Sequence, residues 1–171
     1  MTGWHRCRSR WRYPFFEEPE PRGNRVVFRP VVPVTVGGLS IERALDGLVD
    51  SGSESTLVAG WVADLIGVDL SRPDEVLSIG VGGSRVEARF VPVELRLHRW
   101  LDISTDDYVA WQAEVGFVTP WRPLYPLLLG QSGFFDQFTV TVGRTSLELA
   151  IESPDSYDAR FDTDGLTTVV E

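Results

Sequence analysis

Hydrophobic and polar residues alternate along much of the chain with a period close to two. The stretch RVVFRPVVPVTVGG, residues 25–38, contains many β-branched residues and ends in paired glycines, which signal a turn. A second strand region follows in LSIERALDGLV, residues 39–49, and AWQAEVGFV at 110–118 has the same character. Pro30 and Pro33 indicate an edge strand or a strand with a bend. The pattern predicts a mainly β fold.

Two segments depart from this period. In STLVAGWVADLIGVDL, residues 55–70, the apolar residues fall at helical spacing and Gly67 is placed to end the segment, so we expect a short helix. The segment YPLLLGQSGFFDQFTVTV, residues 125–142, predicts a short apolar strand, a brief helix over about 132–137 and a further strand. Residues 144–151 are expected to pair back onto that last strand through a turn at Gly143 and Arg144.

The remaining segments suggest how the chain is organised. Residues 74–97 predict a long hairpin around the glycine-rich sequence GVGGS, and the polar residues at about 98–109 predict a surface insertion. We therefore expect one domain over residues 25–151. Before it lies an arm of residues 1–24 that is irregular or docked through its aromatic residues, and after it an acidic tail, 152–171, that is disordered or loosely packed.

Composition narrows the classes of function. The net charge of −9 argues against nucleic acid as the main partner, since phosphate binding draws on a basic surface. An N-terminal arm that contacts RNA or a membrane is a weaker alternative to a solvated arm. The single cysteine, Cys7, excludes an intrachain disulfide, and no stretch approaches the roughly 18 apolar residues of a membrane span. We expect a cytoplasmic, soluble protein with no membrane partner.

One carboxylate stands in an unusual context. In GLVDSGSES, residues 47–55, Asp50 follows two aliphatic residues and precedes small hydroxyl residues and a glycine. Asp-Ser-Gly alone is a common turn sequence or helix cap. The two histidines, His5 and His98, lie near no cysteine or carboxylate at ligand spacing, so we expect neither a metal, nor a cofactor, nor a Ser-His-Asp triad.

Three motifs occur in an order that has a parallel in a known family. They are LVDSGSESTLV at 48–58, SIGVGGSRVEARFVPVEL at 78–95 and LLLGQSGFFDQF at 127–138. In this respect the chain resembles the retropepsin-like aspartic proteases, the single-domain relatives of pepsin, and among them the bacterial type. The resemblance implies a closed antiparallel acid-protease β barrel with a glycine-tipped flap hairpin and one or two short helices.

The resemblance also implies a mechanism and a set of site residues. Asp50 would be the catalytic carboxylate, and because the motif occurs once, the active form would be a homodimer in which the two Asp50 side chains activate a water against a polypeptide substrate. The family pattern places the other roles as follows: loop support by Ser51, Gly52 and Ser53; substrate contacts in flap and groove by Gly82, Gly83 and Gly52; packing under the loop by Leu128, Leu129 and Gly130.

Two positions depart from the viral pattern. Viral members usually have an arginine after the glycine that corresponds to Gly130 and an aspartate a few residues past the catalytic one, whereas this chain has Gln131 and Glu54. The pairing that helps to hold viral dimers must differ here. A non-catalytic retropepsin-like module that binds a peptide or protein segment is therefore the alternative function, and a small-ligand β barrel is a third. The sequence predicts neither the substrate nor the cleavage specificity.

Overall fold

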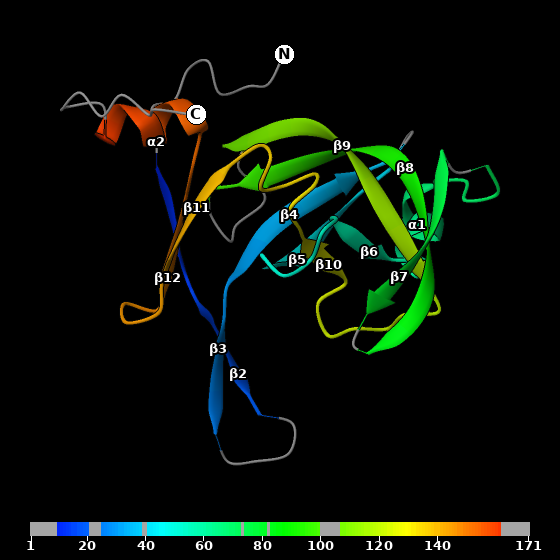
Figure 1. The fold of residues 1–171 in the computed structure, drawn as a ribbon, viewed down its shortest axis with the longest axis horizontal. Helices are drawn as coiled ribbons and strands as arrows, with labels where there is room; N and C mark the ends of the chain where they lie inside the picture. Colours follow the sequence, from blue (N-terminus) through cyan, green and yellow to red (C-terminus); the bar gives the residue numbers. More distant parts are fainter. Residues whose placement is uncertain are drawn as a thin grey trace, which may run out of the picture.

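Strands form most of the ordered structure in this computed structural model, which describes residues 10–20, 25–38, 41–72, 74–81, 83–99 and 107–161. Figure 1 shows these elements with two short helices. The elements are β1 (Trp11–Pro14), β2 (Phe16–Pro19), β3 (Val26–Arg29), β4 (Val31–Gly37), β5 (Glu42–Val49), β6 (Leu57–Ala59), α1 (Trp61–Ile66), β7 (Glu75–Val81), β8 (Ser84–His98), β9 (Tyr108–Thr119), β10 (Leu127–Leu129), β11 (Thr139–Gly143), β12 (Glu148–Glu152) and α2 (Pro154–Phe161). The prediction of a mainly β fold with one or two short helices is confirmed.

The largest sheet has the strand order β4-β5-β10-β6-β9-β8-β7. Strand β4 also pairs with β8. The six strands β4, β5, β10, β6, β9 and β8 therefore pair in a continuous cycle, and β7 lies outside this cycle as an edge strand. Most ladders are antiparallel, as expected, but β10 pairs parallel to β5 and β6 pairs parallel to β9. The short strand β10 therefore lies between β5 and β6, the two strands that flank the Asp50 loop.

The core lies inside this cycle of strands. Strands β8 and β9 form the longest ladder, and their inward side chains include the fully buried Leu95, Val115 and Phe117. Strand β4 adds Val32 and Val34, both with no exposed surface. Burial of one such side chain contributes about 1.5–3 kcal/mol. This packing fixes the ends of β5 and β10, where the candidate site begins.

The N-terminal arm is more ordered than the sequence indicated. The prediction that this arm is irregular is wrong for residues 11–19, which form β1 and β2. The alternative, an arm docked through its aromatic residues, agrees with the burial of Trp11 and Tyr13. Strand β2 pairs with β3 in a hairpin that projects from the body of the molecule in Figure 1, so the expected boundary near residue 25 falls inside one structural unit. The segment 25–38, expected as an edge strand or a strand with a bend, forms two strands that separate at Pro30.

The first helix lies in the predicted segment, whereas the second is not where the sequence placed it. Helix α1 covers only Trp61–Ile66, because Leu57–Ala59 forms the strand β6, and it ends as predicted at Gly67, whose φ of 71° is left-handed. The brief helix expected over 132–137 is a series of turns. The second helix, α2, lies in the segment that was expected to be disordered or loosely packed.

The C-terminal segment completes a second sheet. Strands β11 and β12 pair through a turn at residues 144–147, which confirms the hairpin predicted there, and β1 pairs with the other edge of β12. Helix α2 follows directly and is attached through Arg160, whose guanidinium donates to the buried carboxylate of Glu152 at 2.6 Å. Thus residues 152–161 belong to the folded structure, and residues 162–171 lie outside the described ranges.

The insertion expected at 98–109 is shorter than predicted. His98 is the buried last residue of β8, and Tyr108 begins β9, so both ends of that range belong to the longest ladder. Residues 100–106 lie outside the described part of the chain. Over the residues that are described, no helix is both long enough and apolar enough to cross a membrane.

Candidate active site

Asp50 lies in a tight turn directly after β5. Its backbone N–H donates to Leu129 O at 3.0 Å, and its backbone carbonyl accepts from Ser53 N at 3.1 Å. Its side-chain Oδ1 accepts from Gly52 N at 3.0 Å, which is the local bond that favours aspartate in turns. Oδ2 has no hydrogen-bond partner among the described residues. The half-buried carboxylate is therefore oriented by its own loop and keeps one oxygen available.

The residues after Asp50 hold the turn mainly through backbone groups. Ser51 and Gly52 are exposed, and the carbonyl of Ser51 accepts from Gln131 Nε2 at 2.8 Å. Ser53 Oγ donates to Ser55 O at 2.7 Å, which bends the chain toward β6. Gln131, flagged in the sequence only as a departure from the viral pattern, therefore supports this loop directly.

Strand β10 and Gly130 lie against this loop. Leu129 is fully buried and Leu128 is half-buried, in register with Val49 and Leu48 of β5. At Gly130 a Cβ atom would lie 2.3 Å from Ser55 O, which no side chain can occupy. The close approach of two backbone segments therefore requires glycine here.

Thr56 is a supporting residue that the sequence analysis did not single out. Its hydroxyl is buried, donates to Ser132 O at 2.9 Å and accepts from Gly130 N at 3.2 Å. It thereby joins the start of β6 to the segment after β10. The polar sequence SEST does not predict that its threonine is buried. The one indication of burial is that Thr56 directly precedes the apolar residues LVA.

A groove of about 410 Å³ runs between the loop and the edge strand β7. It is lined by Gly52, Ser53, Glu54, Ser55 and Leu57 on the loop side and by Ser78, Ile79 and Gly80 on the hairpin side. Asp50 itself does not line the groove, but residues 52–55, which follow it in the chain, do.

The hairpin of β7 and β8 forms the other wall, as residues 74–97 predicted. Gly83 is at its turn with a φ of 83°, a conformation that favours glycine, and it does not line the groove. Gly82, the other glycine expected at the tip, lies outside the described residues. Beneath the hairpin a small apolar cluster joins it to the sheet, with Leu57, Ala88, Phe90 and Val118 at its centre.

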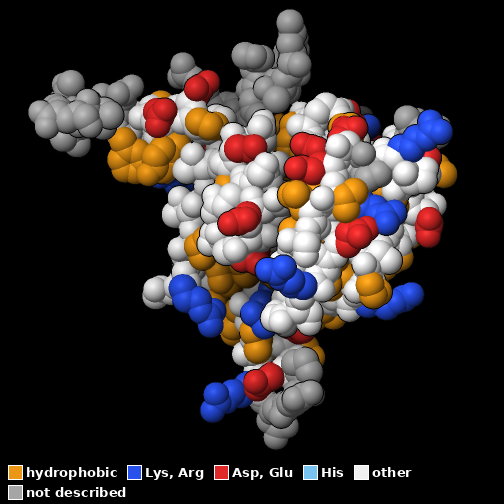
Figure 2. Space-filling model, turned by 45° about the vertical axis from the view of Figure 1, so that its right-hand side comes forward, with side chains coloured by type: hydrophobic (Ala, Val, Ile, Leu, Met, Phe, Trp, Pro, Cys, Tyr) orange, Lys and Arg blue, Asp and Glu red, His pale blue; other side chains and the backbone are white. Residues whose placement is uncertain are grey.

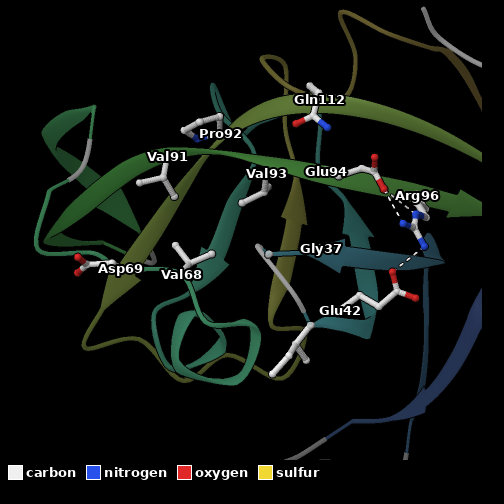
Figure 3. Close-up of a pocket in the computed structure, with 12 residues that line it drawn as sticks. Gly37, Glu42, Val68, Asp69, Val91, Pro92, Val93, Glu94, Arg96 and Gln112 are labelled. Carbon is white, nitrogen blue, oxygen red and sulfur yellow. Dashed lines mark hydrogen bonds and ion pairs between the residues drawn. The ribbon is translucent and has the colours of Figure 1, made fainter.

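A larger hollow, of about 860 Å³, lies on another part of the molecule (Figure 3). It is lined by residues of β4, β8 and β9 and by Val68 and Asp69 after α1. Arg96 lies at one end of it and donates to both Glu94, at 2.7 Å, and Glu42, at 2.6 Å. Among the described residues that line the hollow, the one cation is thus already neutralised by protein carboxylates, and none belongs to the Asp50 loop.

The sequence matches no protein-family model and no curated protein. Among solved structures, the chain is similar to the retroviral protease-like domain of Ddi1 from Leishmania major, with 15% sequence identity and a TM-score of 0.44, over 77% of this chain and 98% of that one.

Proposed function

We propose that this protein is a retropepsin-like aspartic endopeptidase that acts as a homodimer and hydrolyses polypeptides with a water held between two Asp50 carboxylates. The observation that carries the proposal is the geometry of the loop: Asp50 follows a buried strand, Oδ1 is fixed by Gly52 N at 3.0 Å, and Oδ2 has no described partner. A general acid or base needs a fixed orientation and one oxygen for its reactant.

The requirement for a dimer follows from the chemistry. In this mechanism the attack by water uses one ionised and one protonated carboxylate. Two carboxyls about 3 Å apart provide that state, because like charges so close cannot both ionise and the pair shares one proton. Within the described chain no second carboxylate makes a hydrogen bond with Asp50. A second copy related by a twofold axis would supply it and would extend the groove beside β7 into a continuous cleft.

An extended peptide also has a place to bind. Strand β7 is an edge strand, and its apolar residues Val76 and Leu77 are 49% and 40% exposed. Exposed edge strands readily pair with another extended chain. A peptide added along β7 would lie between the hairpin and the loop of Asp50.

The decisive experiment compares Asp50→Asn with the wild type on a diverse peptide library. We expect cleavage to fall by at least about 10³-fold, because the variant has no ionisable carboxyl at the turn. Asp46→Asn is the matched control, since Asp46 is an exposed carboxylate on the same strand β5, and its cleavage rate should equal that of the wild type. Equal cleavage by wild type and Asp50→Asn would exclude the assignment.

A second candidate is a non-catalytic module that binds peptides along β7. The exposed edge of β7 favours it independently of Asp50, and the loss of the viral arginine at Gln131 removes one known contribution to dimer stability. Sedimentation velocity separates the two functions. A strict monomer at tens of micromolar that binds library peptides without cleaving them supports the module, whereas a dimer that cleaves them supports the protease.

A further inference from the structure

Glu54 is an uncompensated carboxylate in the groove. It lines the groove four residues after Asp50, it is exposed, and its side chain makes no ion pair or hydrogen bond with any described residue. Only its backbone carbonyl is engaged, by Ser132 N at 2.9 Å. The groove therefore has a negative charge that the described chain leaves unpaired.

Neighbouring groups do not supply the missing cation. Gln131 is neutral, and its amide already donates to Ser51 O at 2.8 Å. On the hairpin, the exposed Arg85 is in register with the groove residue Gly80 but makes no ion pair with Glu54, and Arg89 is bound to Glu87 at 2.7 Å and to Leu70 O at 3.2 Å. A charge-assisted hydrogen bond stabilises a carboxylate in a partly enclosed groove. The unpaired Glu54 carboxylate is therefore suited to bind a cationic group of a ligand.

The walls of the groove fit a particular kind of side chain. Leu57 and Ile79 provide apolar surface, whereas Ser53, Ser55 and Ser78 provide hydroxyl oxygens. Ser53 Oγ uses its proton on Ser55 O, so its lone pairs can accept from an N–H group. Arginine and lysine have this dual character, with an aliphatic stem and a cationic head.

We propose that the groove selects peptides with an arginine or lysine at one subsite, and that Glu54 is the residue that determines this specificity. The inference rests on the proposed function in that it uses the same groove as the peptide site. The chain's net charge of −9 favours the approach of cationic peptides. On the face in Figure 2 arginines are interspersed with carboxylates.

The test measures binding apart from catalysis. Fluorescence anisotropy with the Asp50→Asn variant would rank labelled hexapeptide pools in which one position at a time is arginine, lysine or citrulline, the neutral analogue of arginine. We expect one position to prefer arginine over citrulline by about tenfold. Adding Glu54→Gln should bring that ratio to about one without weakening the citrulline pool, and Glu54→Arg should favour glutamate there.

A matched control is Glu75→Gln, which removes an exposed carboxylate from β7 that does not line the groove and should leave the ratio unchanged. Persistence of the arginine preference in Glu54→Gln, absence of a preference at every position, or absence of binding would overturn the inference. Failure of the protease proposal is a separate result. If the wild type never cleaves but its preference for arginine is abolished by Glu54→Gln, the protease proposal is rejected and the subsite is supported. If the wild type cleaves without preferring basic peptides, the protease proposal is supported and the subsite is rejected.

Discussion

Glu152 and Asp50 both stand at the C-terminal ends of strands, and their surroundings differ. Glu152, the last residue of β12, has no exposed surface and lies 2.6 Å from Arg160 and 3.7 Å from Arg10. Asp50, directly after β5, is half-buried and is held by the backbone N–H of Gly52 rather than by a cation. The first charge is compensated within the fold, whereas one oxygen of the second has no hydrogen-bond partner among the described residues.

The regions around these carboxylates are also built differently. The terminal sheet attaches its last helix through side chains, chiefly the pair of Glu152 and Arg160. The loop of Asp50 is fixed by backbone bonds and by close backbone contact at Gly130. The Asp50 carboxylate is thus oriented by the main chain, while the side chains of Ser53, Thr56 and Gln131 hold the surrounding segments together.

The largest expected effect tests the backbone contact that fixes the loop. Gly130→Ala places a Cβ atom 2.3 Å from Ser55 O and 2.8 Å from Ser53 O, so the two segments must separate. We expect the free energy of unfolding to fall by about 3 kcal/mol or more, measured by urea denaturation. Gly80→Ala is the control, because a Cβ there meets no atom within 4 Å. Equal stability of the two variants would show that the loop is not fixed at Gly130.

The second prediction addresses the two carboxylates directly. Glu152→Gln keeps the shape of the side chain but removes the charge that binds Arg160, and we expect a loss of about 2 kcal/mol in the free energy of unfolding. Asp50→Asn should change it by only about 0.5 kcal/mol or less, because no described cation depends on that carboxylate. Denaturation of both variants side by side measures the difference. If Asp50→Asn lowered the free energy of unfolding more than Glu152→Gln does, Asp50 and not Glu152 would be the carboxylate that stabilises the fold.

The sequence carried more information about the Asp50 region than about the terminal sheet. The alternating pattern and the glycines predicted the hairpin of β7 and β8, the turn after Val49 and the short strand before Gly130. The hairpin and the turn depend on neighbours in the chain, and local patterns describe such features well. The short strand β10 pairs with the distant β5 and β6, so only its apolar run, and not its partners, could be predicted. The role of Asp50 stays a proposal, since a shared proton needs a second subunit.

Long-range pairing explains most of what the sequence did not predict. Strand β1 forms because β12, more than 130 residues later, offers it an edge, as in the register of Trp11 with Ile151. Likewise Leu57–Ala59 forms a strand because it pairs with β9 and β10, although the spacing of its apolar residues predicts a helix. In both places tertiary contacts override the local pattern. Thr56 was missed for the same reason, as its hydroxyl is buried by a segment about 75 residues away.

The smallest expected effect concerns a buried imidazole at the junction of the two regions. His98 accepts a hydrogen bond at its backbone carbonyl from Tyr13 of β1, at 2.7 Å, and its ring Nε2 lies 2.7 Å from Thr35 Oγ1. Burial, with a smaller contribution from the positive charge of Arg96, lowers the pKa of His98, and Glu42 opposes this. The neutral imidazole is therefore favoured in the folded state.

The sign of the pH dependence follows from this direction. Once the pH falls below about 6.5, the ordinary pKa of histidine, the unfolded chain binds a proton that the folded chain resists, so stability decreases until the folded pKa is reached. In His98→Gln this contribution is absent, and its free energy of unfolding should decline less steeply between pH 7 and pH 5 than that of the wild type. Urea denaturation across that range measures both slopes. Parallel slopes would mean that His98 titrates alike in both states, and that the junction of β1 with β8 does not hold the ring away from water.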